Sequence, residues 1–288
     1  MTPSVLPDHG PNRRPDGPPA GRSHLERLIQ HYAGLTGVAP DRVRRWVSVM
    51  VLLGALERVG EEEKPRLLLK GGIAIELRFG TNARATKDVD LVFLGDPEQL
   101  EDDLDEALEQ DYSQFAFQRR PINEVPGTSF WRLDVKLAYR GRAWATLKLE
   151  VAPPDTKALD PEPVKAIDIG EFGLDGPTMV KCLSTRYQIA QKLHAVTERF
   201  DDGDNERFRD LIDLLLLREI VDDLPGLRAA CLDIFVARGK QPWPPKLIVP
   251  DSWADPYRAL AEEMQFPIID VGDAGGRVKD FIAEIASS

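Results

Sequence analysis

The 288-residue chain has little cysteine and no long apolar run. Its two cysteines, Cys182 and Cys231, stand among apolar neighbours and belong to no CxxC or Cys/His pattern, which predicts buried, reduced thiols and no zinc site. The longest nearly apolar run, 46–56, is too short to span a bilayer, and the proline-rich start lacks the apolar core of a secretory signal. We therefore expect a cytoplasmic protein without a membrane segment.

The chain also lacks an excess of basic residues. It has 37 Lys plus Arg against 48 Asp plus Glu, a net charge of −11 with the four His neutral. Proteins that bind nucleic acid mainly by neutralising phosphates carry a basic surface over the whole domain. That class is excluded, and only a local basic patch remains available for RNA. With 42% hydrophobic and 30% charged residues, the composition is typical of soluble globular domains and excludes disorder of the whole chain.

The residue pattern predicts three regions. Residues 1–22 are dense in proline and glycine and are expected to form a disordered extension. Residues 23–160 mix helical and strand-like patterns, which predicts an α/β domain. Residues 161–288 are expected to form a mainly helical C-terminal domain, because helical periodicity dominates after Pro153 and Pro154. The predicted fold class is therefore α/β, followed by helices.

Helix signals open the α/β domain. Ser23 and Glu26 have the spacing of a capping box, and Asp41 is expected to cap a second helix that ends at Gly60. Further helices are predicted at 97–110, 184–200, 205–218, 227–237, 256–263 and 276–286. Strands are predicted at 67–69, 88–93, 115–120, 130–139 and 145–151.

Two aspartates define the candidate site. Asp88 and Asp90 lie two residues apart in a predicted strand, so their side chains project from the same face. Between Val89 and Leu91 their charge is costly without a counter-ion, and paired carboxylates bind hard divalent cations. Taken alone, the pair is explained equally well by two solvated acids at the edge of a strand.

A glycine pair nearby favours the metal-site interpretation of the two aspartates. Gly71 and Gly72 join the strand 67–69 to a short helix, and such a turn lets backbone N–H groups at a helix start approach a phosphate. Most glycine pairs are merely tight turns. Fifteen residues lie between this pair and Asp88, however, where the carboxylate motif begins. Metal-assisted nucleotidyl transfer needs both parts, one to hold a triphosphate and the other to hold Mg²⁺ or Mn²⁺.

A third carboxylate is expected on a neighbouring strand. Glu150 is the favoured candidate because it lies near a strand end, where active sites gather, and Asp134 is the runner-up.

These segments carry a resemblance to a known family. Residues 69–72 and 87–91 resemble the first motif of the DNA polymerase β-like nucleotidyltransferase superfamily. Residues 189–195 and 207–214 are similar to motifs of its AbiEii/AbiGii-type abortive-infection toxin branch, and the match covers roughly 67–217. The resemblance implies a nucleotidyltransferase-type mixed sheet with a helical C-terminal domain. It also implies that the protein is the toxin of a toxin–antitoxin pair, with a cognate antitoxin as protein partner.

The resemblance also implies roles for individual residues. Asp88 and Asp90 would bind the metal, Lys192 would contact the triphosphate, and Asp210 would be the acid of the last motif. Glu150, favoured above from its strand position, would complete the metal site. Substrate-binding residues are expected at Lys70, Gly71, Gly72, Thr86, Arg199 and Arg209. Two departures from the family pattern stand out. Ile73 replaces a frequent Ser or Thr, which removes one phosphate hydrogen bond, and the spacer before the aspartates is long.

The helical motifs also have a physical interpretation. Lys192 and Arg199 are seven residues apart, about two helical turns, so both are expected to point the same way. His194 lies on another face and is interpreted as a packing residue. Asp210 and Asp213 share one helix edge, where Asp210 is expected to pair with a cation. A purely structural ion pair is the rival interpretation.

The predicted function is metal-dependent transfer of NMP from an NTP to RNA, with tRNA 3′ ends as the acceptor that the resemblance implies. Nucleotidylation of a protein stays open because the motifs specify the donor side alone, and a degenerate, non-catalytic binding module is the second alternative. A single-stranded end is compatible with an acidic protein, since few phosphate contacts and base stacking suffice. The cations expected to contact it are Lys70, Arg78, Arg84, Lys87, Arg199, Arg207 and Arg209.

Overall fold

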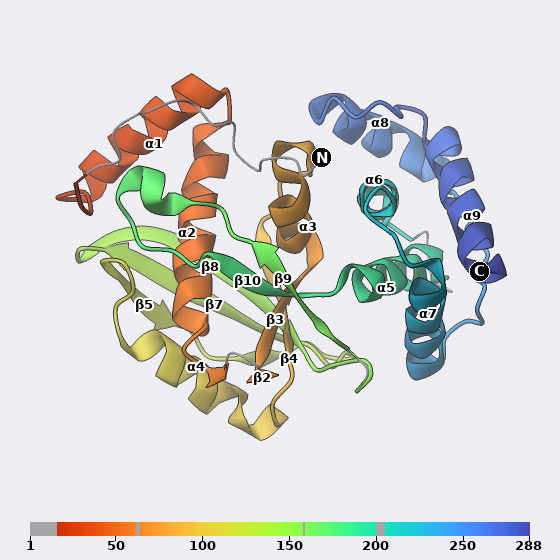
Figure 1. Ribbon diagram of the computed structural model, residues 1–288, viewed down its shortest axis with the longest axis horizontal. Helices are drawn as coiled ribbons and strands as arrows, with labels where there is room; N and C mark the ends of the chain where they lie inside the picture. The colour runs from red at the N-terminus through yellow and green to blue at the C-terminus, as the bar shows by residue number, and fades with distance from the viewer. Residues whose placement is uncertain (1–15, 62–63, 158, 200–204) are drawn as a thin grey trace. The chain divides into compact units, whose positions relative to one another are not determined.

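The computed structural model describes residues 16–61, 64–157, 159–199 and 205–288 (Figure 1). The chain divides into two compact units. The first, called the sheet unit, contains the residues up to Thr81, Ala85–Pro154 and Pro163–Cys182. The second, called the helical unit, contains Asn82–Arg84, Asp155–Glu162 and Leu183–Ser288. Among the described helices, none is long and apolar enough to cross a membrane.

The sheet unit is built on one mixed β-sheet, which confirms the expected α/β class. Its strand order is β5-β7-β8-β4-β3-β10-β9, and the short β6 (Asn123–Glu124) pairs with β7. The strands β4 and β8 are parallel, as are β3 and β10, whereas β3–β4, β7–β8 and β5–β7 are antiparallel pairs. The bounds are β3 Leu67–Lys70, β4 Asp88–Phe93, β5 Phe115–Arg119, β7 Trp131–Tyr139, β8 Arg142–Ala152, β9 Pro161–Lys165 and β10 Met179–Leu183. A separate small hairpin joins β1 (Gly60–Glu61) to β2 (Lys64–Pro65).

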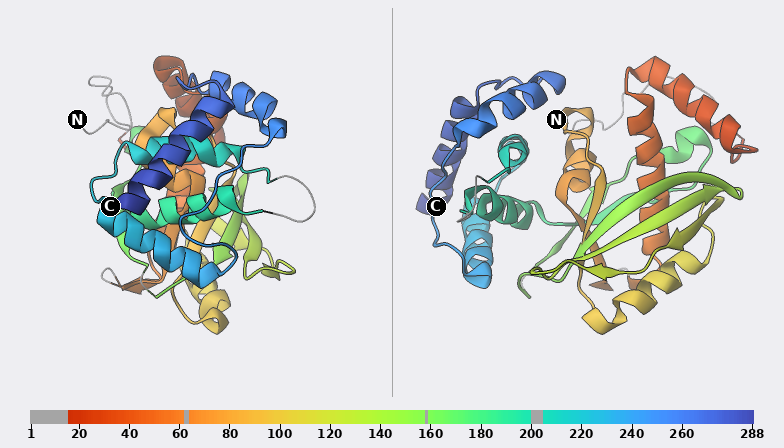
Figure 2. Two further views of the ribbon diagram at one scale, coloured as in Figure 1. Left: turned by 90° about the vertical axis from the view of Figure 1, so that its right-hand side faces the viewer. Right: turned by 180° about the vertical axis from the view of Figure 1, so that it is seen from behind.

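Alternation along the strands gives this sheet one apolar and one polar face. Val89, Leu133 and Leu149 are buried in the core together with α2 (Pro40–Leu56), whose residues from Val47 onward are all buried. On the other face, β4 carries Asp88 and Asp90, β7 carries residues 132, 134 and 136, and β8 carries residues 146, 148 and 150, all of them polar and at least partly exposed. Figure 2, seen from behind, shows the sheet in front of α2. The apolar face thus forms the core, and the polar face is where chemistry is available.

The helices of the sheet unit begin differently from the sequence-based expectation. The helix α1 (Arg22–Thr36) has Gly21 at its N-cap, and the predicted capping box is not formed. Instead the Glu26 carboxylate accepts hydrogen bonds from Arg22 at 2.9 Å and Arg44 at 3.0 Å, which is a stronger, charge-assisted arrangement. The remaining helices are α3 (Gly71–Phe79) and α4 (Leu100–Glu109).

Asp41 does not cap α2 either. That helix begins at Pro40, and proline suits the first helical position because it has no N–H to satisfy. The helix ends at Leu56, before the predicted Gly60.

The proline-rich segment is only partly extension. Residues 1–15 lie outside the described residues, but Pro19 is buried. Its carbonyl oxygen accepts hydrogen bonds from the Tyr139 hydroxyl at 2.6 Å and from Arg140 Nε at 3.0 Å. The prediction of a disordered segment up to residue 22 was therefore wrong for its last part. Composition could not reveal it, because the contact uses a backbone carbonyl that any residue carries.

The helical unit contains the helices predicted near the C-terminus. These are α5 (Thr185–Thr197), α6 (Phe208–Arg218), α7 (Leu224–Arg238), α8 (Ala254–Glu263) and α9 (Val271–Ser287). The helix α5 packs on α6 and α7, and α9 packs on the same two helices. Cys231 on α7 is a buried, free thiol, and so is Cys182 on β10, as expected. The expectation of helices alone after Pro154 was wrong, since β9 and β10 extend the sheet beside β3.

Candidate active site

Strand register gathers the predicted carboxylates on the polar face of the sheet. Asp90 on β4 is the lateral neighbour of Lys70 on β3 and of Glu150 on β8, and Glu150 is the neighbour of Arg132 on β7. Paired residues on adjacent strands point to the same side of a sheet. These four side chains therefore form one row across the sheet. Two carboxylates stand in the middle of the row and a cation stands at each end.

A second row lies beside the first. It runs from Asp88 on β4 to Lys148 on β8 and Asp134 on β7. Asp88 and Asp90 occupy alternate positions of β4 and so share a face, in agreement with the predicted periodicity.

The start of α3 lies directly against this carboxylate group. Gly71 has a φ of +67°, and a Cβ atom added there would lie 1.9 Å from Asp90 Oδ2. A Cβ added at Gly72 would lie 2.8 Å from the Thr86 Cβ. Both glycines are required because neighbouring side chains already fill the space, and Gly71 also has a backbone conformation that favours glycine. The positive end of the α3 dipole consequently stabilises negative charge at Asp90.

A buried ion pair fixes α3 on α2. The Glu76 carboxylate, 1% exposed, accepts hydrogen bonds from Arg42 Nε at 2.6 Å and Trp46 Nε1 at 2.8 Å. Arg42 also donates to the carbonyl of Gly80 at 3.1 Å, just past the C-terminal end of the helix. Sequence reasoning missed these residues. The available signal was an acid inside the otherwise apolar helix segment 73–77, which demands a buried partner.

Both candidates for the third carboxylate line one hollow on the polar face. This hollow has a volume of about 490 Å³ and contains Asp88 on the β4 side. Glu150 lies on the strand next to the two aspartates and accepts hydrogen bonds from Arg132, with Nε at 2.8 Å. Asp134 lies one strand further away. The remaining lining residues include four that sequence reasoning did not single out, namely Arg120, Asn123, Arg132 and Lys148.

A different arrangement surrounds Lys192 in the helical unit. Its Nζ atom lies 2.6 Å from Asp210 Oδ1 and 2.7 Å from Asp213 Oδ2, so the ion pair expected for Asp210 is present. Asp213 also pairs with Arg84, whose Nη2 atom lies 3.0 Å from Oδ2. Burial alone would lower the pKa of Lys192, but the two carboxylates outweigh it and raise that pKa. Burial would likewise raise the pKa of Asp213, yet Lys192 and Arg84 hold it below its usual range.

Two predicted substrate-binding cations lie apart from this network. The helix α5 ends at Thr197, so Arg199 is outside it and exposed, and the helical spacing expected between Lys192 and Arg199 does not exist. Arg209 is exposed on α6, with its guanidinium 4.7 Å from the ring centre of Phe208.

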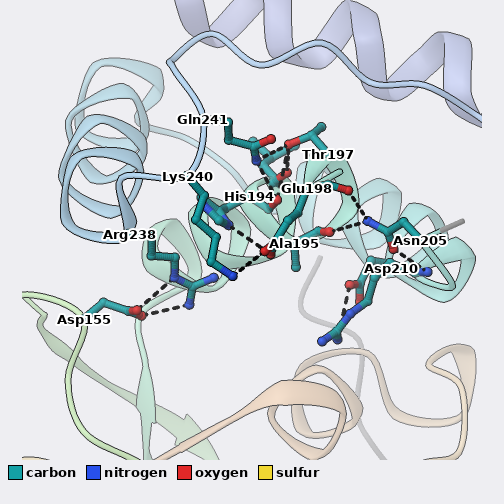
Figure 3. Close-up of polar contacts among 12 residues, drawn as sticks. Asp155, His194, Ala195, Thr197, Glu198, Asn205, Asp210, Arg238, Lys240 and Gln241 are labelled. Carbon is teal, nitrogen blue, oxygen red and sulfur yellow. Dashed lines mark hydrogen bonds and ion pairs between the residues drawn. The ribbon is translucent and has the colours of Figure 1, made fainter. Parts of the chain in front are cut away.

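His194 is a packing residue, as its position on α5 indicated. The side chain is 1% exposed, and its ring meets Phe235 edge to face at 5.0 Å. Neither ring nitrogen has a hydrogen-bond partner among the described residues. Burial, reinforced by the nearby Arg238, lowers the pKa of His194 to about 4. Figure 3 shows the polar contacts around it, including the hydrogen bond from Gln241 to its carbonyl at 2.8 Å.

Comparison with known proteins identifies the family. The model of the nucleotidyl transferase AbiEii toxin family, described as a type IV toxin–antitoxin system, matches residues 54–281. This chain belongs to the AbiEii family. It is accordingly a nucleotidyltransferase of the toxin type, which confirms the resemblance drawn from its motifs. A search of curated protein sequences gives no match.

A solved structure shares the fold of this chain. MenT4, a nucleotidyltransferase toxin from Mycobacterium tuberculosis H37Rv, superposes with a TM-score of 0.60 at 19% identity, over 91% of this chain and 90% of that chain. The structure of ANT(2″)-Ia in complex with adenylyl-2″-tobramycin has a TM-score of 0.37 at 16% identity, over 68% of this chain and 97% of that one, which is a remote likeness. The mixed sheet and the C-terminal helices therefore form a nucleotidyltransferase fold shared with MenT4.

Proposed function

We propose that this AbiEii-family protein transfers NMP from an NTP to the 3′ hydroxyl of RNA, with tRNA as the acceptor and a divalent metal ion as cofactor. The observation that carries the proposal is the contact of the Asp90 carboxylate with Gly71, at the start of α3, with Glu150 beside it in register. This arrangement combines a place for a polyphosphate with a group of acids on one rigid sheet.

The acids fit a hard divalent cation. Within the described residues, no group of three or more His, Cys, Asp or Glu side chains is already drawn together as a metal site. Asp90 and Glu150 are nevertheless like charges in neighbouring register positions, and a cation between them would offset their mutual repulsion. Their oxygen donors are those that Mg²⁺ and Mn²⁺ prefer. Asp88, Asp90 and Glu150 would hold the metal, which would supply activation of the attacking hydroxyl and stabilisation of the leaving pyrophosphate.

The donor phosphates are assigned to the first turn of α3. Backbone N–H groups at a helix start have no partner within the helix and attract anions. Ile73 cannot add the hydroxyl that many family members have at this position. We assign that hydrogen bond to Thr86, because its side chain lies against Gly72 and carries the hydroxyl closest to this turn. Lys70, at the end of β3, completes the donor side.

Lys192 is assigned a phosphate contact through its ammonium group. An ammonium group has three N–H donors, and Asp210 and Asp213 take two of them. The third can donate to a phosphate oxygen, and Asp210 would then orient the ammonium group. Arg199 and Arg209 are assigned weaker, exposed contacts with substrate.

The test is incubation with each labelled NTP and either intact tRNA or periodate-oxidised tRNA, which lacks the 3′ hydroxyl. We expect label in intact tRNA alone, and only with a divalent metal present. Label in a protein band would replace the RNA acceptor with a protein acceptor. Absence of transfer to either class, with every NTP, would favour a binding module.

A further inference from the structure

The hollow that Asp88, Asp134 and Glu150 line also contains cations that the catalytic assignment leaves unused. Arg120 and Lys148 both line it and are exposed. Neither side chain has an ion-pair partner within 4.0 Å among the described residues. Lys148 stands between Asp88 and Asp134 in register, yet pairs with neither. The backbone N–H of Arg120 donates to the carbonyl of Asp134 at 2.7 Å, which places Arg120 beyond Asp134 in the second row.

An aromatic ring stands on the same side of the sheet. Phe130 immediately precedes β7, and its side chain is 39% exposed. The Lys70 ammonium lies 5.6 Å from the centre of this ring. Since Lys70 is the register neighbour of Asp90, the ring lies close to the row of carboxylates. Exposed aromatic rings beside cations are the usual platform for bases of single-stranded nucleic acid.

The geometry of the reaction gives this side of the site a role. In an in-line displacement at phosphorus, the attacking and leaving oxygens lie on opposite sides of the phosphorus atom. The donor phosphates are assigned to α3, which follows β3, on one side of Asp90. The attacking hydroxyl then arrives from the other side, over β8 and β7, where Lys148 and Arg120 lie.

We infer that the hollow lined by Arg120, Lys148 and Asn123 holds the single-stranded 3′ end of the acceptor RNA, with Phe130 outside this lining, beside Lys70. Arg120 and Lys148 contact its phosphates, and Phe130 stacks on a base. This inference rests on the proposed function for its substrate class. It adds an acceptor site made of residues that the family motifs do not include.

Binding can be measured independently of catalysis. Fluorescence anisotropy with a fluorescein-labelled, single-stranded oligoribonucleotide reports the dissociation constant of the full chain in the absence of NTP. One phosphate contact lowers the slope of log affinity against log salt by about 0.7 for a single strand, which corresponds to about fourfold in affinity near ~0.15 M salt. Arg120→Gln and Lys148→Gln should each show this loss, and the double variant should show about twice the change in slope.

The chain offers a matched control. Arg142 is exposed on the same strand as Lys148, six residues away at the far end of β8. Arg142→Gln removes the same charge and should leave binding unchanged. Phe130→Ala should weaken binding about tenfold, as expected for the loss of one stacked base, and Phe130→Trp should restore it.

The two proposals fail in different ways. Wild-type affinity in both Arg120→Gln and Lys148→Gln, equal losses in Arg142→Gln, or no binding by the wild type would each overturn the acceptor site, whatever the labelling assay shows. Binding that depends on Arg120 and Lys148, together with no transfer of label to RNA, would overturn the proposed function and leave the binding site in place.

Discussion

The charged side chains of the two units differ in their burial and in their ion pairing. On the sheet unit, Asp88, Asp90 and Glu150 lie half-buried on an open strand face, where Asp90 and Glu150 are register neighbours and Glu150 pairs with the exposed Arg132 at 2.7 Å. In the helical unit, Lys192 and Asp213 are enclosed in a network in which each charge has partners at 2.6–3.0 Å.

This difference distinguishes charged groups that bind a ligand from charged groups that stabilise the fold. An open group of acids is stabilised by an added cation, so its residues are expected to matter for chemistry and little for stability. A closed network is already neutralised, and removing one member leaves a buried charge without compensation. Lys192 belongs to the second class by its contacts, even though the family motif gives it a role with substrate. The predictions below test this distinction.

The largest effect is expected at the aspartates. Asp88→Asn and Asp90→Asn keep the side-chain shape but remove a negative charge, and a metal ion contributes several kcal/mol to charge stabilisation in the transition state. NMP transfer should fall by about 1000-fold or more, at about 1.4 kcal/mol per tenfold. The melting temperature should stay constant or rise for Asp88→Asn, because repulsion between neighbouring carboxylates is relieved. It should change little for Asp90→Asn, because losing the favourable interaction with the α3 dipole opposes that relief. Transfer at the wild-type rate by either variant would contradict the assignment of these acids.

Lys192 should show the reverse, a large loss of stability. Lys192→Met leaves Asp210 and the fully buried Asp213 without their ammonium partner, which costs about 3–5 kcal/mol of unfolding free energy. Urea denaturation of the full chain measures it. The control is Arg277→Gln, which breaks an exposed ion pair with Asp273 and should cost less than about 0.5 kcal/mol. If both variants unfold at the same urea concentration, the network around Lys192 is not structural.

The helix that carries Lys192 also provides a pH-dependent prediction. His194 has a pKa of about 4 in the folded protein, whereas an unfolded histidine titrates near ~6.5. As the pH falls from about 6.5 to about 4, the His194 imidazole is protonated in the unfolded state but stays neutral in the folded state. The free energy of unfolding therefore decreases by about 3 kcal/mol in total. His194→Leu should remove this part of the pH dependence, measured as the difference from wild type between pH 7 and pH 4. His31→Gln, at an exposed histidine, should retain it.

The smallest change in the rate of NMP transfer is expected from substitutions at Glu150 and Asp134, the two candidates for the third carboxylate. Glu150→Gln should lower the transfer rate about tenfold, because the residue lies beside Asp90 and is already positioned by Arg132. Asp134→Asn, one strand away, should change the rate less than about twofold. A larger loss from Asp134→Asn would move the third acid to β7.

Local patterns predicted the centre of the fold well. The run 67–69, the glycine pair and the period-two aspartates gave β3, α3 and β4 nearly residue by residue, because each signal lies within a few neighbouring positions. The strands predicted at 130–139 and 145–151 correspond to β7 and β8, which a turn at Arg140 and Gly141 joins. The strand β9 was missed, since a segment with Pro161 and Pro163 does not read as a strand, and prolines are accommodated there only because β9 is at the edge of the sheet.

Long-range partners were beyond the reach of such patterns. Arg84 and Asp213 are 129 residues apart, and nothing in either neighbourhood indicates the other. The hollow on the polar face depends on the register of β7 against β8, which the sequence leaves open. A capping-box pattern at Ser23 was misleading, because a distant residue, Arg44, competes for the same carboxylate. Local patterns therefore singled out Asp88 and Asp90, whereas Arg120, Arg132 and Lys148 emerge only from the strand register and the hollow.

The contact between Gly71 and Asp90 has a consequence for genetics. Every single-nucleotide missense change in a glycine codon adds at least a Cβ atom, and at residue 71 that atom would lie 1.9 Å from an aspartate oxygen. When such a toxin gene is expressed without its antitoxin, cells that survive are those whose copy has lost activity. Codon 71 should then recur among survivors as often as the aspartate codons, although the residue that it encodes has no side chain to lose.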